Sequence, residues 1–279
     1  MSTYTMPSIL DEIMKWENEV RENFSELEWP SGYLLRFDPS DNGGYPCSPA
    51  DAIQFANTGM DGIHFAFLTD FGMVKDLNRA PIVVVDPMNF GNSVRIVAND
   101  IRGFFELRFS GHEGLLMNDF ASREDYTAFL SEEGKDHSTP YFDHSNWKRQ
   151  KEEASAMAMA RFGLQSIEDG FAYVEQARLA RRERCVLDSS GGIGVAIGLE
   201  TGLLGEVVPH PWHEERIPEH NVDELLAYID DAEQVGLFGF IRDCQAQGVT
   251  NAVVVRALCD RLESIGLSLE AKKLLHCLD

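Results

Sequence analysis

The stretch DGIHFAFLT, residues 61–69, indicates the fold class because it places a turn signal directly before a strand pattern. The dipeptide Asp61-Gly62 is typical of tight turns, since glycine adopts positive φ at no steric cost. In the run that follows, large apolar side chains alternate with residues that are themselves mostly apolar. Neither face is clearly polar, so the stretch predicts a strand that is covered on both faces.

Two further runs have the same character. The segment Pro81–Asp86 contains four consecutive β-branched residues, which favour a buried strand. A third strand-like run covers Val94–Ala98. The linkers between the runs are too short for the crossover helices that parallel strands require. We therefore expect the three strands to form an antiparallel meander.

An amphipathic helix is predicted near the N-terminus, ending before Trp29-Pro30. Its apolar positions recur every three or four residues, which places them on one helical face. They are Ile9, Ile13, Trp16, Val20, Phe24 and Leu27.

Three more helices are expected around the strands. Ser48-Pro49 is typical of a helix start and Gly59 of a helix end, so a short helix is predicted between them. Asn99 is the expected cap of a second helix, which carries two consecutive phenylalanines. Ser122 begins the third.

The polar segment Asp136–Asn146 is the expected connection between an α+β region, 1–135, and a mainly helical region, 147–279. Helical patterns cover Trp147–Phe162, Ile167–Arg182 and at least three segments from Val222 onward. A Gly-rich, strand-like passage, 186–199, interrupts them and predicts a short β hairpin. The predicted fold class is therefore α+β, with an antiparallel sheet flanked by helices and a largely helical C-terminal region.

The formal net charge of −22 limits the classes of partner. Nucleic-acid phosphates and anionic lipid surfaces repel so acidic a chain, whereas basic proteins attract it. No segment reaches the roughly 20 apolar residues that cross a bilayer. The N-terminal residues lack the charge and hydropathy pattern of a signal peptide. We therefore expect a cytoplasmic protein that binds neither nucleic acid nor membrane.

The five cysteines are odd in number and widely spaced, and none forms a CxxC pair. Such spacing fits neither a disulfide framework nor a zinc site, so reduced thiols are expected. No cofactor motif is present, and no cofactor is expected.

A loop rich in proline and histidine is the densest set of potential metal ligands. His210, His213 and His220 lie near Glu214 and Glu215, and imidazole and carboxylate groups bind zinc and related metals. The prolines make the segment extended, without the i, i+4 spacing that aims two histidines at one ion. A metal-dependent hydrolase that uses this loop is an alternative interpretation.

Two other motifs have ordinary structural explanations. The glycines after Ser189-Ser190 suggest a phosphate loop, but no Lys-Ser/Thr follows them, and a hairpin explains them. The basic cluster at the end of the 167–182 helix complements the helix dipole, with a phosphate-binding patch as the alternative. Its members are Arg178, Arg181, Arg182 and Arg184.

Catalysis has little support in the sequence. His64 lies between apolar strand residues, where a hydrogen-bonded histidine is more typical than a catalytic one. Asp61, Asp70 and Asp86 fall near strand ends and could bind a cation, but turn chemistry also explains them. No nucleophile elbow and no kinase signature is present.

Part of the chain, from Trp29 to about Phe109, resembles the SUKH superfamily, which includes the cell-wall assembly and glucan-synthesis regulators. The order of elements carries the resemblance, together with these residues: Trp29-Pro30, Pro49, Phe55-Ala56-Asn57-Thr58-Gly59, Asp61-Gly62, Pro81-Ile82-Val83-Val84-Val85, Val97-Ala98-Asn99-Asp100-Ile101 and Phe104-Phe105. The resemblance implies an α+β domain with a central antiparallel sheet and no catalytic site. Bacterial members are commonly immunity proteins that neutralise toxins, many of them nucleases, and eukaryotic members are regulatory interaction proteins.

These observations favour a non-enzymatic protein-binding module with a basic partner, such as a toxin domain. The candidate contacts are acidic residues in loops around the predicted sheet: Asp38, Asp41, Asp70 and Asp76. The alternatives are the metal-dependent hydrolase and a scaffold protein that self-assembles through its C-terminal helices.

Overall fold

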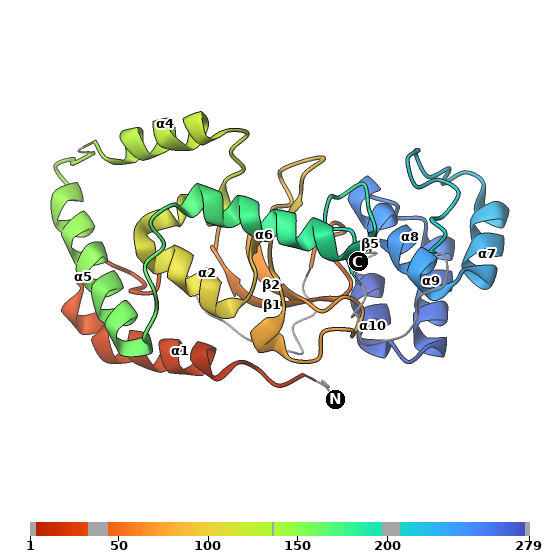
Figure 1. Cartoon of the computed structure of the whole chain (residues 1–279), viewed down its shortest axis with the longest axis horizontal. Helices are drawn as coiled ribbons and strands as arrows, with labels where there is room; N and C mark the ends of the chain where they lie inside the picture. The colour runs from red at the N-terminus through yellow and green to blue at the C-terminus, as the bar shows by residue number, and fades with distance from the viewer. Residues whose placement is uncertain (1–3, 33–43, 136, 197–206, 277–279) are drawn as a thin grey trace.

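A four-stranded antiparallel sheet lies in the middle of the molecule (Figure 1). The computed structural model describes residues 4–32, 44–135, 137–196 and 207–276. The strand order β1-β2-β3-β4 is that of a meander, which confirms the predicted topology, the three predicted strands and the α+β class. The strands are β1 (Ala52–Asn57), β2 (His64–Leu68), β3 (Ile82–Val85) and β4 (Val94–Ala98).

Strand β1 corrects one prediction, because the helix expected between Ser48-Pro49 and Gly59 is instead the first strand of the sheet. The capping residues form only a turn, in which the Ala52 N–H donates to the Pro49 carbonyl at 2.9 Å. The next residues pair with β2, where Phe55 packs against Phe67 with ring centroids 4.7 Å apart. Pairing with β2 satisfies backbone groups and buries Phe55 completely, and these gains outweigh the local helix signals.

Helices cover both faces of the sheet, which explains why β2 and β3 are apolar on both sides. One face forms the first core with α1 (Ser8–Val20) and α2 (Ile101–Leu107). The other face packs against Ala177 of α6 (Gly170–Arg184) and against Ile193. The N-cap of α2 is Asp100, one residue beyond the predicted Asn99.

The helices after α2 extend the first core. Ser122 caps α4 as predicted, and α5 contributes Ala154 and Ala158 to the core that also contains α1 residues. Core residues therefore come from both sides of the 136–146 segment. The elements of this part are η1 (Arg21–Asn23), η2 (Leu77–Arg79), the π-helical η3 (Arg108–His112), α3 (Gly114–Met117), α4 (Arg123–Glu133) and α5 (His144–Phe162).

A second core lies at the opposite end of the molecule, where the C-terminal helices gather (Figure 1). The predicted Gly-rich hairpin is present as β5 (Cys185–Leu187) paired with β6 (Val195–Ala196). Within the described part of the chain, no helix is long and apolar enough to span a membrane. The C-terminal helices are α7 (Val222–Asp231), α8 (Gln234–Gln247), α9 (Ala252–Ser264) and α10 (Ser268–His276).

Candidate functional site

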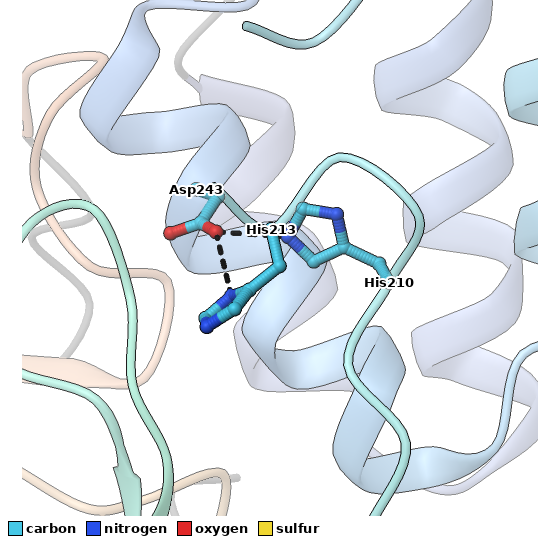
Figure 2. Close-up of side chains that lie close together, drawn as sticks. All are labelled: His210, His213 and Asp243. Carbon is cyan, nitrogen blue, oxygen red and sulfur yellow. Dashed lines mark hydrogen bonds and ion pairs between the residues drawn. The ribbon is translucent and has the colours of Figure 1, made fainter. Parts of the chain in front are cut away.

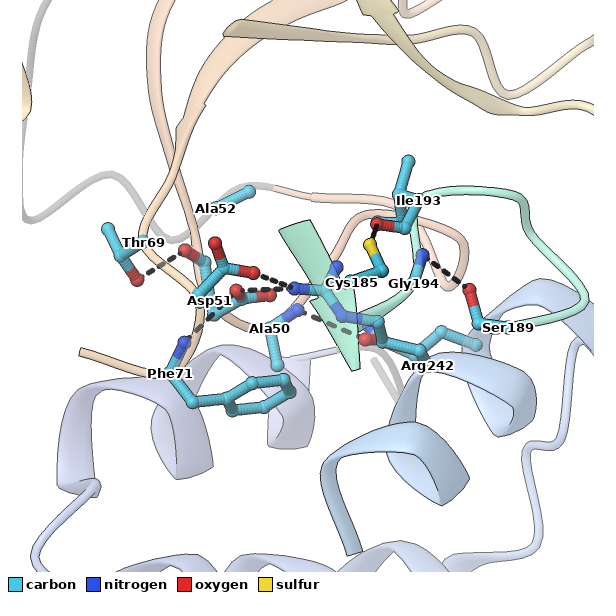
Figure 3. Close-up of polar contacts among 12 residues, drawn as sticks. Ala50, Asp51, Ala52, Thr69, Phe71, Cys185, Ser189, Ile193, Gly194 and Arg242 are labelled. Atoms are coloured by element: carbon cyan, nitrogen blue, oxygen red, sulfur yellow. Dashed lines mark hydrogen bonds and ion pairs between the residues drawn. The ribbon is translucent and has the colours of Figure 1, made fainter. Parts of the chain in front are cut away.

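Four buried charged side chains join the sheet to helices α6 and α8. Asp51 and Asp70 come from the sheet region, and Arg181 and Arg242 come from α6 and α8, each only 1–3% exposed. Asp70 accepts two hydrogen bonds from the Arg181 guanidinium, at 2.7 and 2.6 Å. Arg242 Nη2 donates to Asp51 Oδ2 at 2.8 Å, as Figure 3 shows, and to Asp70 Oδ1 at 3.2 Å. Two carboxylates and two guanidiniums balance one another, so the cluster is neutral overall.

The backbone at Asp70 takes an unusual conformation that places this carboxylate in the cluster. Asp70 and Phe71 have φ values of 49° and 52°, in the left-handed region that side chains with a Cβ rarely adopt. The Phe71 N–H donates to Asp51 Oδ2 at 3.2 Å, and its ring stacks on Phe238 at 4.0 Å. These contacts hold two strained residues in place, and such strain persists only where the surrounding structure enforces it.

The surroundings of Arg181 favour its charged form. Burial lowers the pKa of Arg181, but its hydrogen bonds with Asp70 and the charge of that carboxylate more than offset the effect, so the net shift is upward. Arg181 also binds the Gly-rich loop, because Nε donates to the Ile193 carbonyl at 2.7 Å. The cluster therefore holds four segments together, namely the sheet region, α6, α8 and the Gly-rich loop, and offers no free carboxylate at the surface.

A second buried group surrounds Asp243 of α8, whose side chain is completely buried (Figure 2). Its Oδ1 accepts from the Ser190 N–H at 2.6 Å and from Ser190 Oγ at 2.9 Å. Its Oδ2 accepts from His210 Nε2 at 2.8 Å and lies 3.6 Å from His213 Nδ1. One carboxylate thus anchors both the Gly-rich loop and the loop rich in proline and histidine on α8.

The same three side chains are the candidate metal ligands, with ligand atoms within 4.8 Å of one another. His210 Nδ1, however, accepts the Trp212 N–H at 3.2 Å, so Nδ1 carries no hydrogen and Nε2 must carry one. A protonated Nε2 donates to Asp243 and has no lone pair for a metal. His213 and Asp243 then supply two ligands, fewer than the three or four that protein zinc sites use. The residues present therefore do not fit a metal ion in this arrangement.

The structure separates the residues that the sequence grouped. His220 is exposed and stands outside the Asp243 group, while Asp243 itself was not predicted. The sequence signal for Asp243 is weak, because a single Asp in the apolar helix α8 indicates only a buried polar residue.

The four aspartates predicted to contact a partner do not share one surface environment in the structure. Asp70 is buried and bound by two arginines, so the structure corrects its assignment as a surface contact. Asp76 is exposed and caps η2, accepting the Asn78 N–H at 3.0 Å. Hydrogen bonds from Asn78 lower the pKa of Asp76. Asp38 and Asp41 lie outside the described residues.

The most accessible apolar side chains near the sheet gather at one of its ends. Asn57, His64, Val85 and Val94 pair in one row across the four strands. The β1–β2 and β3–β4 loops therefore leave the sheet at the same end. We call their exposed apolar side chains, with those of the segment beside them, the hairpin-end patch: Tyr45 (42% exposed), Met60 (60%), Met88 (64%) and Phe90 (84%).

The loop that carries Met88 and Phe90 is well ordered by its own hydrogen bonds. The Asp86 N–H donates to the Ser93 carbonyl at 2.7 Å, and Asp86 Oδ1 accepts the Met88 N–H at 3.2 Å. Its apolar side chains are therefore presented on a fixed backbone. A sequence signal for the patch does exist, because methionine and phenylalanine are unusual inside turn segments such as DPMNFGN, residues 86–92.

Comparison with known proteins assigns no family or function to the chain. No protein-family model matches the chain, and no curated protein is similar to it in sequence.

Proposed function

We propose that this chain is a non-enzymatic protein-binding module that captures a basic partner on its hairpin-end patch. The observation that carries the proposal is the exposure of Phe90 and Met88 on an ordered loop. Large apolar side chains that gather at one place on a surface mark interaction sites, and aromatic residues and methionine are enriched in interfaces. A fixed backbone lowers the entropy cost of binding.

Charge favours a basic partner. The net charge of −22 steers basic proteins towards the chain. Asp61, in the β1–β2 loop of the patch, is exposed and forms no ion pair within the described residues. The patch therefore offers apolar side chains next to the exposed carboxylate of Asp61. Such a surface can bind a basic protein that inserts one apolar side chain among its positive charges.

The resemblance to the SUKH superfamily supports a toxin domain as that partner, and a nuclease in particular. Nucleases that bind phosphates present basic surfaces, which an acidic inhibitor complements. The chain would then act as an immunity protein. The proposal requires no catalytic residue, and the buried Asp51, Asp70 and Asp243 serve internal hydrogen bonds.

Affinity capture with variants of the patch tests the proposal. Tagged wild-type protein and the Phe90→Ser and Met88→Ser variants are incubated with lysates of the native cells and of neighbouring strains, and retained proteins are identified by mass spectrometry. Tyr141→Ser is the matched control, because Tyr141 is 99% exposed but lies between α4 and α5. We expect wild type and the control to retain the same basic protein.

The strength of binding to that protein is then measured for each variant. A hot-spot aromatic contributes about 2 kcal/mol or more, so Phe90→Ser should weaken binding about 30-fold. Equal binding by wild type, Phe90→Ser and Met88→Ser would remove the patch from the interface. Retention of no basic protein by any variant would count against the proposed function itself.

A further inference from the structure

Two motifs that are separate in the sequence line one cavity in the structure. The arginines of α6 and the glycines of the β5–β6 loop border a cavity of about 250 Å³ beside strand β4. Its lining includes Arg95, Arg178, Arg181, Arg182, Gly191 and Gly192. Four guanidiniums around one cavity are unexpected in a chain with a net charge of −22.

Two of these arginines have donors to spare. Arg95 is 4% exposed, and its two terminal nitrogens donate to the Asn92 and Met117 carbonyls. Its buried Nε has no hydrogen-bond partner in the described structure, because Asp119 Oδ1 is 3.9 Å away. The side chain of Arg182 is exposed and forms no ion pair or hydrogen bond with the described residues. An unpaired buried donor is costly, so Arg95 Nε suggests a missing acceptor.

The other two arginines are already paired. Arg178 lies 3.3 Å from Asp119 and 3.1 Å from Glu175, and Arg181 is held by Asp70. They contribute positive charge to the wall, but their carboxylate partners balance it. Arg95 also has carboxylates nearby, with Asp86 at 3.8 Å and Asp119 at 3.9 Å. The attraction for an anion therefore depends mainly on the charge of Arg182 and on the unsatisfied Arg95 Nε donor.

The Gly-rich loop supplies a backbone donor to the same cavity. The Gly191 N–H forms no hydrogen bond within the described residues, whereas the Gly192 N–H donates to the Ser189 carbonyl at 2.9 Å. Gly192 has φ +74° and no atom within 4 Å of the position that a Cβ would occupy. A ligand can therefore approach the backbone closely, as it does in glycine-rich loops that bind phosphate.

We propose that this arginine-lined cavity binds the phosphate group of a small phosphomonoester. A phosphate dianion offers three acceptor oxygens, which match planar guanidinium donors and a backbone amide better than one carboxylate does. A second cavity, of about 240 Å³, shares Val94, Gly191 and Ile193 with the first and has a mainly apolar lining. It receives the organic part of the ligand. This inference is independent of the hairpin-end patch.

Calorimetric titration of the full chain with three probes tests the proposal: inorganic phosphate, adenosine monophosphate and adenosine. We expect inorganic phosphate to bind at millimolar concentration, adenosine monophosphate to bind more tightly, and adenosine to bind much more weakly. Raising the salt concentration should weaken binding of the first two. Equal binding of adenosine and adenosine monophosphate, or no binding of either phosphate probe, would overturn the proposal.

Matched arginine variants locate the site. Arg182→Gln removes a cavity guanidinium, and Arg184→Gln removes an exposed one from the same last turn of α6 that does not line the cavity. We expect Arg182→Gln to weaken binding of adenosine monophosphate about tenfold, as the loss of one charged hydrogen bond does. Arg184→Gln should leave it nearly unchanged. An equal loss in both variants would show non-specific attraction and refute the site. Circular dichroism checks that both variants are folded.

Discussion

Asp70 and Arg181 are 111 residues apart in the chain, yet they form a bidentate ion pair at the junction between the sheet and α6. Both side chains are almost completely buried. Arg242 approaches the same carboxylate from α8, so one aspartate connects the sheet with two later helices. The junction therefore depends on buried ion pairs. Removal of one charged partner should lower the free energy of unfolding substantially.

The Asp70→Asn substitution tests how much this junction contributes to the free energy of unfolding. Asparagine tolerates the left-handed backbone at position 70, so the change isolates the loss of charge. Because Arg181 and Arg242 would lose a buried counter-charge, we expect the free energy of unfolding to fall by about 3 kcal/mol. Urea denaturation followed by circular dichroism measures it. Glu214→Ala, at an exposed position, should change it by less than about 0.5 kcal/mol. A loss below about 1 kcal/mol in Asp70→Asn would contradict the assigned role.

The Asp243 group should not hold zinc. His210 Nε2 carries a hydrogen and donates it to Asp243, which leaves too few ligands for the ion. We expect purified protein to contain far less than one zinc per chain by elemental analysis, and equimolar zinc to leave its Tm unchanged. Stoichiometric zinc that survives dialysis and disappears in Asp243→Asn would instead support the hydrolase alternative.

Acid should destabilise the chain partly through His64. Burial lowers the pKa of His64, although its hydrogen bond to the Gly62 carbonyl opposes the shift. The unfolded chain then binds more protons than the folded one as the pH falls below the ordinary histidine pKa of about 6.5, so stability falls with it. Between pH 7 and pH 5, the free energy of unfolding should therefore decrease less in His64→Gln than in wild type. Urea denaturation at each pH measures this decrease. The exposed His220→Gln should follow wild type, and identical curves for all three proteins would argue against a role for His64.

Two glycines of the β5–β6 loop form a matched pair. Gly194 has φ +52°, and a Cβ there would lie 2.6 Å from Cys185 Sγ and 2.9 Å from the Leu187 carbonyl oxygen. Gly192 also has a positive φ, but a Cβ there would meet open space. Gly192→Ala should therefore cost only the backbone strain of about 1–2 kcal/mol, and Gly194→Ala clearly more. Equal losses of unfolding free energy would show that the loop adjusts to remove the clash.

Sequence patterns were sufficient for most of the sheet and for several helices. The alternation after Asp61-Gly62 and the β-branched run after Pro81 predicted β2 and β3, because burial on both faces requires apolar residues throughout. Strand β1 was missed since the capping signals at Ser48-Pro49 are local. Its pairing with β2 depends on a partner that lies beyond the following turn.

The candidate site was far less predictable than the fold. Periodicity and turn chemistry depend on neighbours within a few residues, so the amino-acid order was enough to indicate the meander and the Gly-rich hairpin. Which charges meet was decided by packing of the sheet against α6 and α8. That packing buried Asp70 between Arg181 and Arg242. The contact of the proline- and histidine-rich loop with α8 joined His210 to Asp243, and the return of the chain after α6 placed Arg182 and Gly191 at one cavity. Such pairings follow from the three-dimensional positions of whole elements, because a buried charge takes whichever opposite group the folded core places beside it.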